Sequence, residues 1–260
     1  MQDRGRNLFY ILGSFFVANA LLAEFIGVKI FSLEGTLGLS PVNWDLFGID
    51  NLSFNLSAGV LLWPVVFIMT DIINEYFGRK GVRFLSFTAA ALISYAYFMV
   101  YFAMELHPSD FWIQRVTNSG TVNMDIAFNV IFGQGLWIII GSLVAFLIGQ
   151  LVDVAVFHYL RGFTGSSKIW LRATGSTLVS QFIDSFVVLF IAFYFGAGWD
   201  ISLVLAIGIV NYTYKFAIAV LLTPILYVLH YLIDLYLGKE LSEKLIREAA
   251  RSSGSLTAAN

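Results

Sequence analysis

Long apolar runs constrain this chain more than any other feature of its sequence. Six of them reach or exceed the roughly 20 residues that an α-helix needs to cross a bilayer; they cover residues 8–31, 54–77, 82–106, 126–159, 171–195 and 201–237. Of the 260 residues, 58% are hydrophobic and only 12% are charged, about half the charged share of soluble domains. The sequence therefore predicts an all-α membrane protein, a bundle of six transmembrane helices.

The positive charges indicate which way the bundle faces. Connections 34–53 and 196–200 contain no Lys or Arg, and 107–125 contains Arg115 alone, whereas the alternate connections and both ends are basic. The cations there are Arg4, Arg6, Arg79, Lys80, Arg83, Arg161, Lys168, Arg172, Lys239, Lys244, Arg247 and Arg251. Because short cytoplasmic loops are enriched in Lys and Arg, we expect both termini in the cytoplasm.

The domain organisation follows from the same pattern. Residues 1–238 are expected to form one transmembrane domain, and 239–260 a cytoplasmic tail with an amphipathic helix at 240–250 and a disordered end at 251–260. The fourth and sixth runs exceed the length that a span needs. They either tilt beyond the bilayer or break at 133–135 and at Thr223-Pro224. The outer connection 34–53 is expected to form a turn or a short hairpin.

Polar residues near the centres of the spans are costly in lipid and therefore point to function. Helical spacing places Thr177, Gln181 and Asp184 on one face of the fifth span, and Asn211 and Lys215 on one face of the sixth. With Asn19 of the first span, these six residues form the candidate substrate site. The alternative is an Asp184–Lys215 ion pair that only holds the bundle together.

A second polar group lies toward the cytoplasmic ends of the spans. Its candidate gating or coupling residues are Asp71, Gln150, Asp153 and Arg172. The alternative is that these side chains merely reach the membrane interface. Glu24, in the outer part of the first span, either lines an entry vestibule or reaches the interface in the same way.

The sequence contains no enzyme signature. It has no cysteine, its three histidines (His107, His158 and His230) lie on separate segments, and no P-loop or hydrolase motif occurs. The net charge of −2 does not suggest a nucleic-acid partner. We expect no catalytic residue, no metal site and no cofactor.

Four segments carry a family resemblance. They are residues 63–80 (WPVVFIMTDIINEYFGRK), 149–157 (GQLVDVAVF), 171–190 (LRATGSTLVSQFIDSFVVLF) and 214–227 (YKFAIAVLLTPILY). In this order they resemble the queuosine precursor transporter family, also called the vitamin uptake transporter family. The first span, ANALLAEFIGVK with Glu24, departs from the family pattern.

The resemblance implies a multi-pass protein of the bacterial inner membrane that imports 7-deazaguanine precursors of the tRNA base queuosine. It implies functional roles for ten residues: Asn19, Asp71, Gln150, Asp153, Arg172, Ser176, Thr177, Gln181, Asp184 and Lys215. A carboxylate accepts the two adjacent donors of a guanine-like edge, so we expect Asp184 to bind that edge and Lys215 to contact O6 or to hold Asp184. The site is expected near the bilayer midplane between the first, fifth and sixth helices, with alternating access.

Four points stay open at this stage: two rival functions, the driving force of transport and the oligomeric state. The substrate-capture subunits of energy-coupling-factor transporters are also six-helix proteins, but their A-x-x-x-A pair is absent, because Leu22 follows Ala18 and Glu24 follows Ala20. A scaffold without transport activity is the second rival. Transport could be facilitated diffusion, or proton symport through Asp71 or Asp153. A homodimer through Gly141, Ser142 and Ala145 is the other open point.

Overall fold

The long helices dominate the architecture. A computed structural model describes residues 2–118, 120–133, 135–164 and 168–252. Its described part contains five helical stretches long and apolar enough to cross a membrane. They are α1 (Gln2–Ile26), α3 (Trp63–Met104), α5 with α6 (Met124–Phe132 and Leu136–Thr164), α7 (Ile169–Leu189) with the π-helical turn η2 (Phe190–Phe195), and α8 (Ile201–Leu237). The prediction of an all-α membrane protein is confirmed at this level.

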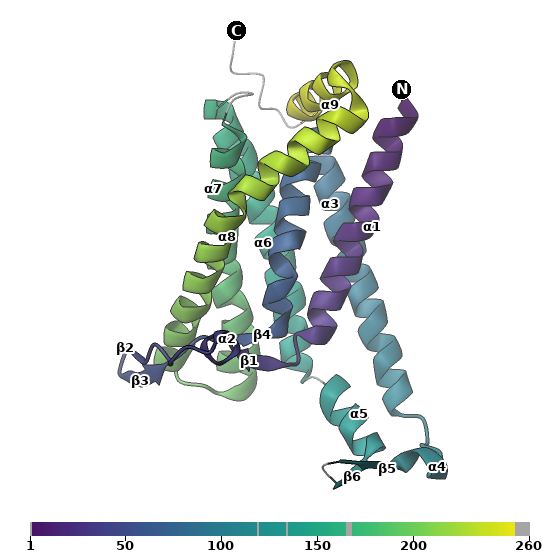
Figure 1. The fold of residues 1–260 in the computed structure, drawn as a ribbon, viewed down its shortest axis with the longest axis vertical. Helices are drawn as coiled ribbons and strands as arrows, with labels where there is room; N and C mark the ends of the chain where they lie inside the picture. The colour runs from purple at the N-terminus through teal and green to yellow at the C-terminus, as the bar shows by residue number, and fades with distance from the viewer. Residues whose placement is uncertain (1, 119, 134, 165–167, 253–260) are drawn as a thin grey trace.

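The second of these stretches, α3, is folded back on itself at Gly78. This residue has φ 67° and ψ −172°, a conformation that only glycine adopts at low cost. Thr70 and Ser86 hydrogen-bond to the same Gln150 Oε1 atom, at 3.0 and 3.4 Å. In a straight helix they would be about 24 Å apart. The two limbs of α3, Trp63 to Phe77 and Arg79 to Met104, are therefore antiparallel (Figure 1), which is why five long stretches stand where six were predicted.

One end of the bundle carries small β-structures. β1 (Ile30–Ser32) pairs antiparallel with β4 (Asn55–Ser57), and β2 (Trp44–Leu46) with β3 (Ile49–Leu52). In the chain, α2 (Leu33–Leu37) lies between β1 and β2, and the 3-10 turn η1 (Ala58–Leu61) leads from β4 into α3. The short hairpin predicted within 34–53 is confirmed as β2–β3.

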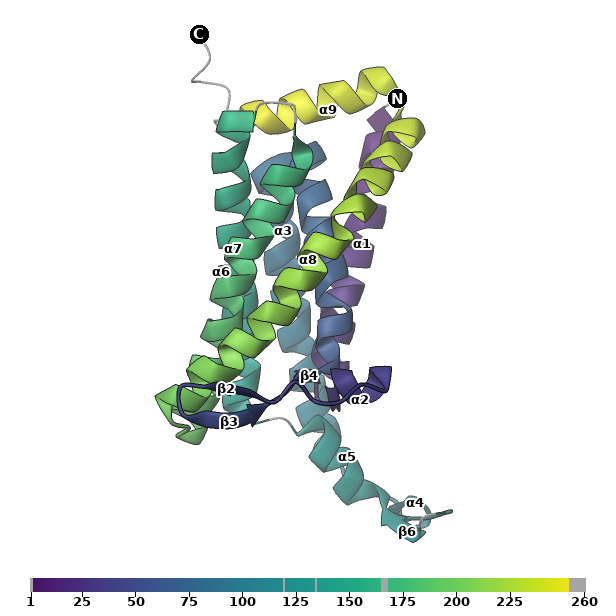
Figure 2. The ribbon, with the colours of Figure 1, turned by 60° about the vertical axis from the view of Figure 1, so that its left-hand side comes forward.

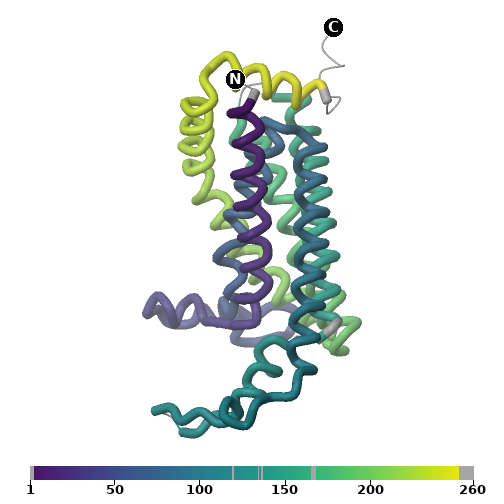
Figure 3. Tube along the Cα trace, turned by 90° about the vertical axis from the view of Figure 1, so that its right-hand side faces the viewer, coloured from purple at the N-terminus to yellow at the C-terminus, as the bar shows by residue number. Residues whose placement is uncertain are grey.

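A second excursion extends from the same end of the bundle (Figures 2 and 3). It consists of α4 (Asp110–Ile113), the hairpin of β5 (Gln114–Thr117) and β6 (Gly120–Asn123), and α5. The sequence analysis missed this hairpin. α5 ends at Phe132 and α6 begins at Leu136, so the predicted break at 133–135 is present, with Gln134 outside the described residues. α8 runs through Pro224 without interruption.

Small residues bring α6 and α7 together. A Cβ on Gly141 would lie 3.3 Å from the Cβ of Ala192, and Ala145 is buried. Ser142, next to them, donates to Glu24 Oε2 of α1 at 2.9 Å. The small-residue face considered for a homodimer is thus occupied inside the bundle, and the dimer itself stays untested.

The last helix, α9 (Lys239–Ser252), lies across the end of the bundle where α1 begins (Figures 1 and 3). Its Leu241 is buried, and its Ile246 carbonyl accepts a hydrogen bond from Arg161 Nη2 at 3.1 Å. The amphipathic helix predicted at 240–250 is present. The predicted disordered end is wrong for residues 251 and 252, which are helical because the helix continues past its packed face; residues 253–260 lie outside the described part.

Candidate functional site

A polar face of α7 points into the bundle. Residues spaced by three or four positions share one side of a helix, and on α7 that side is almost entirely hydrophilic. Its buried members are Arg172, Ser176, Thr177, Ser180, Gln181 and Ser185. Such a face is costly against lipid, so it requires polar partners from α3, α6 and α8.

The end of this face nearest α9 carries an ion cluster. Arg172 donates twice to Glu75 of α3, from Nη2 to Oε1 at 2.8 Å and from Nε to Oε2 at 3.2 Å. Arg161 of α6 lies 3.7 Å from Glu75 Oε2. All three side chains are at most 5% exposed. This paired geometry is what buried charges require, so the cluster ties α3, α6 and α7 together.

Two further carboxyl groups contact the hydroxyls of α7. Thr177 Oγ1 lies 3.4 Å from Asp71 Oδ2, and Ser180 Oγ lies 3.3 Å from Asp153 Oδ1. Asp71 is 5% exposed and Asp153 is 0% exposed. Within the described residues, Oδ1 of Asp71 and Oδ2 of Asp153 have no hydrogen-bond partner, although buried polar atoms usually have one.

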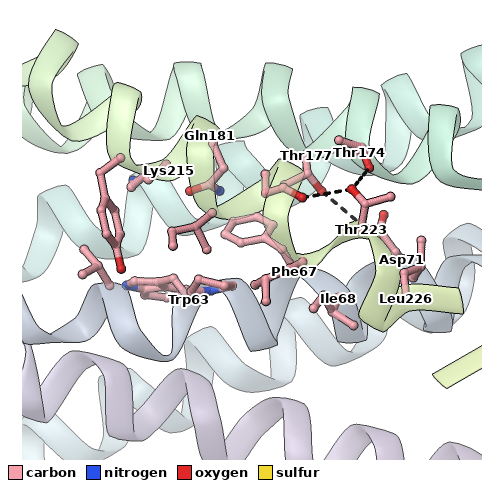
Figure 4. A pocket seen from close by; sticks show the side chains of 16 residues that line it. Trp63, Phe67, Ile68, Asp71, Thr174, Thr177, Gln181, Lys215, Thr223 and Leu226 are labelled. Atoms are coloured by element: carbon pink, nitrogen blue, oxygen red, sulfur yellow. Dashed lines mark hydrogen bonds between the residues drawn. The ribbon is translucent and has the colours of Figure 1, made fainter. Parts of the chain in front are cut away.

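A cavity lies beside Asp71, between the first limb of α3, α7 and α8. The space between its walls is about 550 Å³, counting the part open to the outside. Its lining is Val60, Trp63, Pro64, Phe67, Ile68, Asp71, Thr174, Thr177, Gln181, Tyr214, Lys215, Ile218, Ala219, Leu222, Thr223 and Leu226 (Figure 4).

The cavity combines flat apolar walls with a few unsatisfied polar groups. Trp63 and Phe67 lie on the wall opposite Gln181 and Lys215 in Figure 4. Gln181 Nε2 is buried and, in the described part of the chain, finds no acceptor. With Oδ1 of Asp71, the cavity therefore offers one free donor and one free acceptor. A flat ligand with both kinds of group would satisfy them.

The predicted Asp184–Lys215 pair is formed at the same cavity. Lys215 Nζ lies 2.5 Å from Asp184 Oδ2, and the two side chains are 14% and 21% exposed. Lys215 is part of the lining, whereas Asp184 lies behind it. Each charge therefore has an opposite partner, as the sequence analysis allowed, and the expected contact of Asp184 with the base stays a prediction.

The cavity contains only part of the candidate substrate site. Thr177, Gln181 and Lys215 line it, but Asn19 and Asn211 do not. Asn19 is buried and donates to the Phe15 carbonyl of its own helix at 2.8 Å. α1 packs on the far side of the bundle, so the first limb of α3 takes the place expected for it. The cavity thus lies between α3, α7 and α8, and not between the first, fifth and sixth predicted helices, where the substrate site was expected.

The candidate gating residues are also divided. Asp71 lines the cavity, while Gln150, Asp153 and Arg172 lie behind it in the bundle. Glu24 neither lines the cavity nor reaches the interface. It is buried, and it accepts hydrogen bonds from Tyr97 at 3.2 Å and from Ser142, because its neighbours on α3 and α6 supply hydroxyls.

Sequence reasoning missed the aromatic wall. Trp63, Phe67 and Asp71 follow one another at intervals of four residues, which places them on one face of a helix. This spacing was the available signal. It was not used because Phe is so abundant in the sequence that no ring stood out.

The chain is similar in sequence to known membrane transporters. Residues 57–229 match the family described as "Putative vitamin uptake transporter". The chain is similar to a "Probable queuosine precursor transporter" of Bacillus subtilis, 28% identical over 70% of this chain and 73% of that protein. A protein of the same name from Haemophilus influenzae is 27% identical over 85% of each chain. The "Queuosine precursor transporter" of Escherichia coli is 28% identical over 66% and 71%. No solved structure matches.

Proposed function

The chain belongs to the vitamin uptake transporter family, and from that premise we propose that it imports queuosine precursors across the bacterial inner membrane. The substrates are 7-deazaguanine bases, such as 7-cyano-7-deazaguanine or its aminomethyl analogue. The names of its relatives support this substrate class. The chain is a multi-pass membrane protein of a transporter family and not an enzyme.

The single observation that carries the proposal is the pair of unsatisfied groups in the cavity. A 7-deazaguanine presents adjacent N–H donors beside its O6 acceptor. In this proposal the Asp71 carboxylate accepts from the donors and the Gln181 amide donates to O6, since both residues line the cavity and each has an atom with no partner in the described part of the chain. Trp63 and Phe67 supply apolar surface against the ring, as aromatic side chains do for bases elsewhere.

The course of the chain supports six membrane crossings. The start of α1 and α9 lie at the same end of the bundle (Figure 1), and an even number of crossings is needed to bring them there. Counting the two limbs of α3 separately gives six. The Lys and Arg bias places that end in the cytoplasm. The cavity, between α3, α7 and α8, is then exposed alternately to the outside and the inside.

Ligand-dependent stability of the full chain in lipid nanodiscs tests the substrate claim. The matched ligands are 7-deazaguanine and 7-deazaadenine, which differ only at the edge that Asp71 and Gln181 would read. We expect 7-cyano-7-deazaguanine and 7-deazaguanine to raise the melting temperature, because ligands that bind the folded state stabilise it. 7-Deazaadenine should not raise it.

Asp71→Asn and Asp184→Asn locate the binding edge in the same assay. Loss of the shift in Asp71→Asn with a residual shift in Asp184→Asn supports the cavity as described. The reverse result would move the donor-reading carboxylate to Asp184. If no deazaguanine stabilises the wild-type protein at saturating concentration, the proposed substrate class is wrong.

A further inference from the structure

Asp71 of α3 and Asp153 of α6 contact the same polar face of α7. Their hydroxyl partners, Thr177 and Ser180, are three residues apart, which is a rise of about 4.5 Å along the helix. Ser176, on the same face, interacts with both carboxyl groups. One carboxyl from α3 and one from α6 therefore contact hydroxyls about one helical turn apart on α7, and both carboxyl groups are buried.

The charges around this carboxyl pair do not balance. The buried charged side chains at this level are three acids, Asp71, Glu75 and Asp153, and two bases, Arg161 and Arg172. His158 of α6 is also buried, at 2% exposure. Fully ionised, the cluster would carry one uncompensated negative charge in a low-dielectric interior, which is costly.

The neighbouring groups do not supply the missing positive charge. Toward the other end of α7, Lys215 is neutralised by Asp184. Toward α9, Asp234 accepts from Tyr76 and faces His230. Arg79, at the end of the first limb of α3, is exposed. Within the described residues, the imbalance therefore remains at Asp71 and Asp153.

Unsatisfied polar atoms gather around the same two carboxyl groups. Besides Oδ1 of Asp71 and Oδ2 of Asp153, the buried amides of Asn74 and Gln150 have atoms with no partner among the described residues. Asn74 lies one turn from Asp71 on α3, and Gln150 one turn from Asp153 on α6. A proton on one carboxyl oxygen would supply a donor here. A sodium ion would instead need about six oxygen ligands arranged around one point, as hard cations do.

We propose that Asp71 and Asp153 together hold one proton, which neutralises the interior cluster, and that the transporter changes conformation only with this proton bound. When the cavity is filled, Asp71 is the ionised acceptor for the base and the proton resides on Asp153, the carboxyl behind the cavity wall. The proton comes from water and adds to one carboxylate oxygen, with no other bond changed. The role of the proton in transport rests on the proposed function, whereas its binding does not.

Infrared difference spectroscopy of the full chain in lipid detects the proton directly. A protonated carboxyl has a C=O stretching band separate from the carboxylate bands, and the band shifts in D2O. We expect the wild-type protein to show this band at neutral pH and to lose it in alkaline solution. Asp153→Asn, an uncharged mimic of the protonated side chain, should lack the Asp153 band, which is read from the difference between the two spectra because the buried carboxyl group of Glu24 is common to both. Asp184→Asn is the matched control and should keep it.

Uptake of 7-cyano-7-deazaguanine into proteoliposomes, with equal pH on both sides, tests the role in transport. Wild-type uptake should fall about tenfold per pH unit above the ionisation of the pair, the slope of a single proton. Asp153→Asn should bind the base within about threefold of wild type and transport it with a flat pH profile. Asp110→Asn, at an exposed position, should behave like wild type.

Several outcomes would overturn the proton site. They are the absence of the band in the wild-type protein at neutral pH, its persistence in Asp153→Asn, or stabilisation by sodium in place of the band. The wild-type spectra keep the test valid if Asp153→Asn does not fold. A band that behaves as expected in a protein that binds no deazaguanine would leave the proton site standing and refute the proposed function alone.

Discussion

Two pairs of charged side chains lie along α7, and they differ in net charge and in how far they are buried. Asp184 faces Lys215, so the pair is neutral, and both side chains keep some exposure. Asp71 and Asp153 are like-charged and almost fully buried. An ion pair satisfies itself, whereas two buried carboxyl groups require something from outside the chain. In the proposal made above, the unbalanced pair therefore marks the functional centre, and the more conspicuous ion pair does not.

The largest effect is expected when a positive charge is removed from the buried cluster of three acids and two bases. Arg172→Met would leave Glu75 buried without its bidentate partner and would leave one base, Arg161, against three acids. Breaking a buried ion pair costs about 3–5 kcal/mol. We therefore expect the melting temperature of the empty protein in detergent to fall by several degrees. Arg6→Met, which removes an exposed partner of Asp3, is the control. Equal melting temperatures for the two variants would contradict the charge count.

The second test removes one of the like charges. Asp71→Asn should weaken 7-cyano-7-deazaguanine binding by about 10- to 150-fold, since a hydrogen bond to a charged group contributes about 1.5–3 kcal/mol. The empty protein should be no less stable than wild type, because the two remaining acids then match the two bases. Calorimetric titration and thermal unfolding measure the two effects. A destabilised variant with normal affinity would show that Asp71 is structural.

The sequence predicted the outline of this centre but not its arrangement. The apolar runs and the polar face of α7 follow from helical periodicity, which is a local property. Which helix faces α7 depends on tertiary packing, which local periodicity does not reveal. The sequence therefore predicts a gating role for Asp71 and a binding role for Asn19. In the structure the first limb of α3, and not α1, forms the cavity wall. The sharp reversal at Gly78 was read from its flanking cations as a loop. Asp71 differs from Asp184 in having a buried oxygen with no hydrogen-bond partner in the described part of the chain, and this difference can be seen only in the folded structure.

The third test breaks the Asp184–Lys215 ion pair. It should lower the stability of the empty protein, whereas the second test should not. Asp184→Asn leaves the Lys215 ammonium without its carboxylate, which we expect to destabilise the empty protein by about 1–2 kcal/mol. This is less than for Arg172, because the pair keeps some exposure. The double variant Asp184→Leu with Lys215→Met should recover much of the loss, as apolar replacements of buried pairs often do. Thermal unfolding of the three variants in one detergent decides the point. A double variant less stable than the single one would show that the pair does more than neutralise itself.

The smallest change in affinity is expected at Gln181, an uncharged residue of the cavity lining. Its replacement should change ligand binding without lowering stability. Gln181 Nε2 has no acceptor in the described structure, so Gln181→Met should leave the empty protein equally or more stable, since an unsatisfied buried donor is removed. The base would lose one neutral hydrogen bond to O6, worth about 0.5–1.5 kcal/mol, and bind roughly 2- to 12-fold more weakly. 7-Deazaadenine, which lacks O6, should be indifferent to the change. Weaker binding of 7-deazaguanine with unchanged stability would assign O6 to Gln181. Unchanged binding would instead assign O6 to Lys215, and the ion pair would then belong to the substrate site after all.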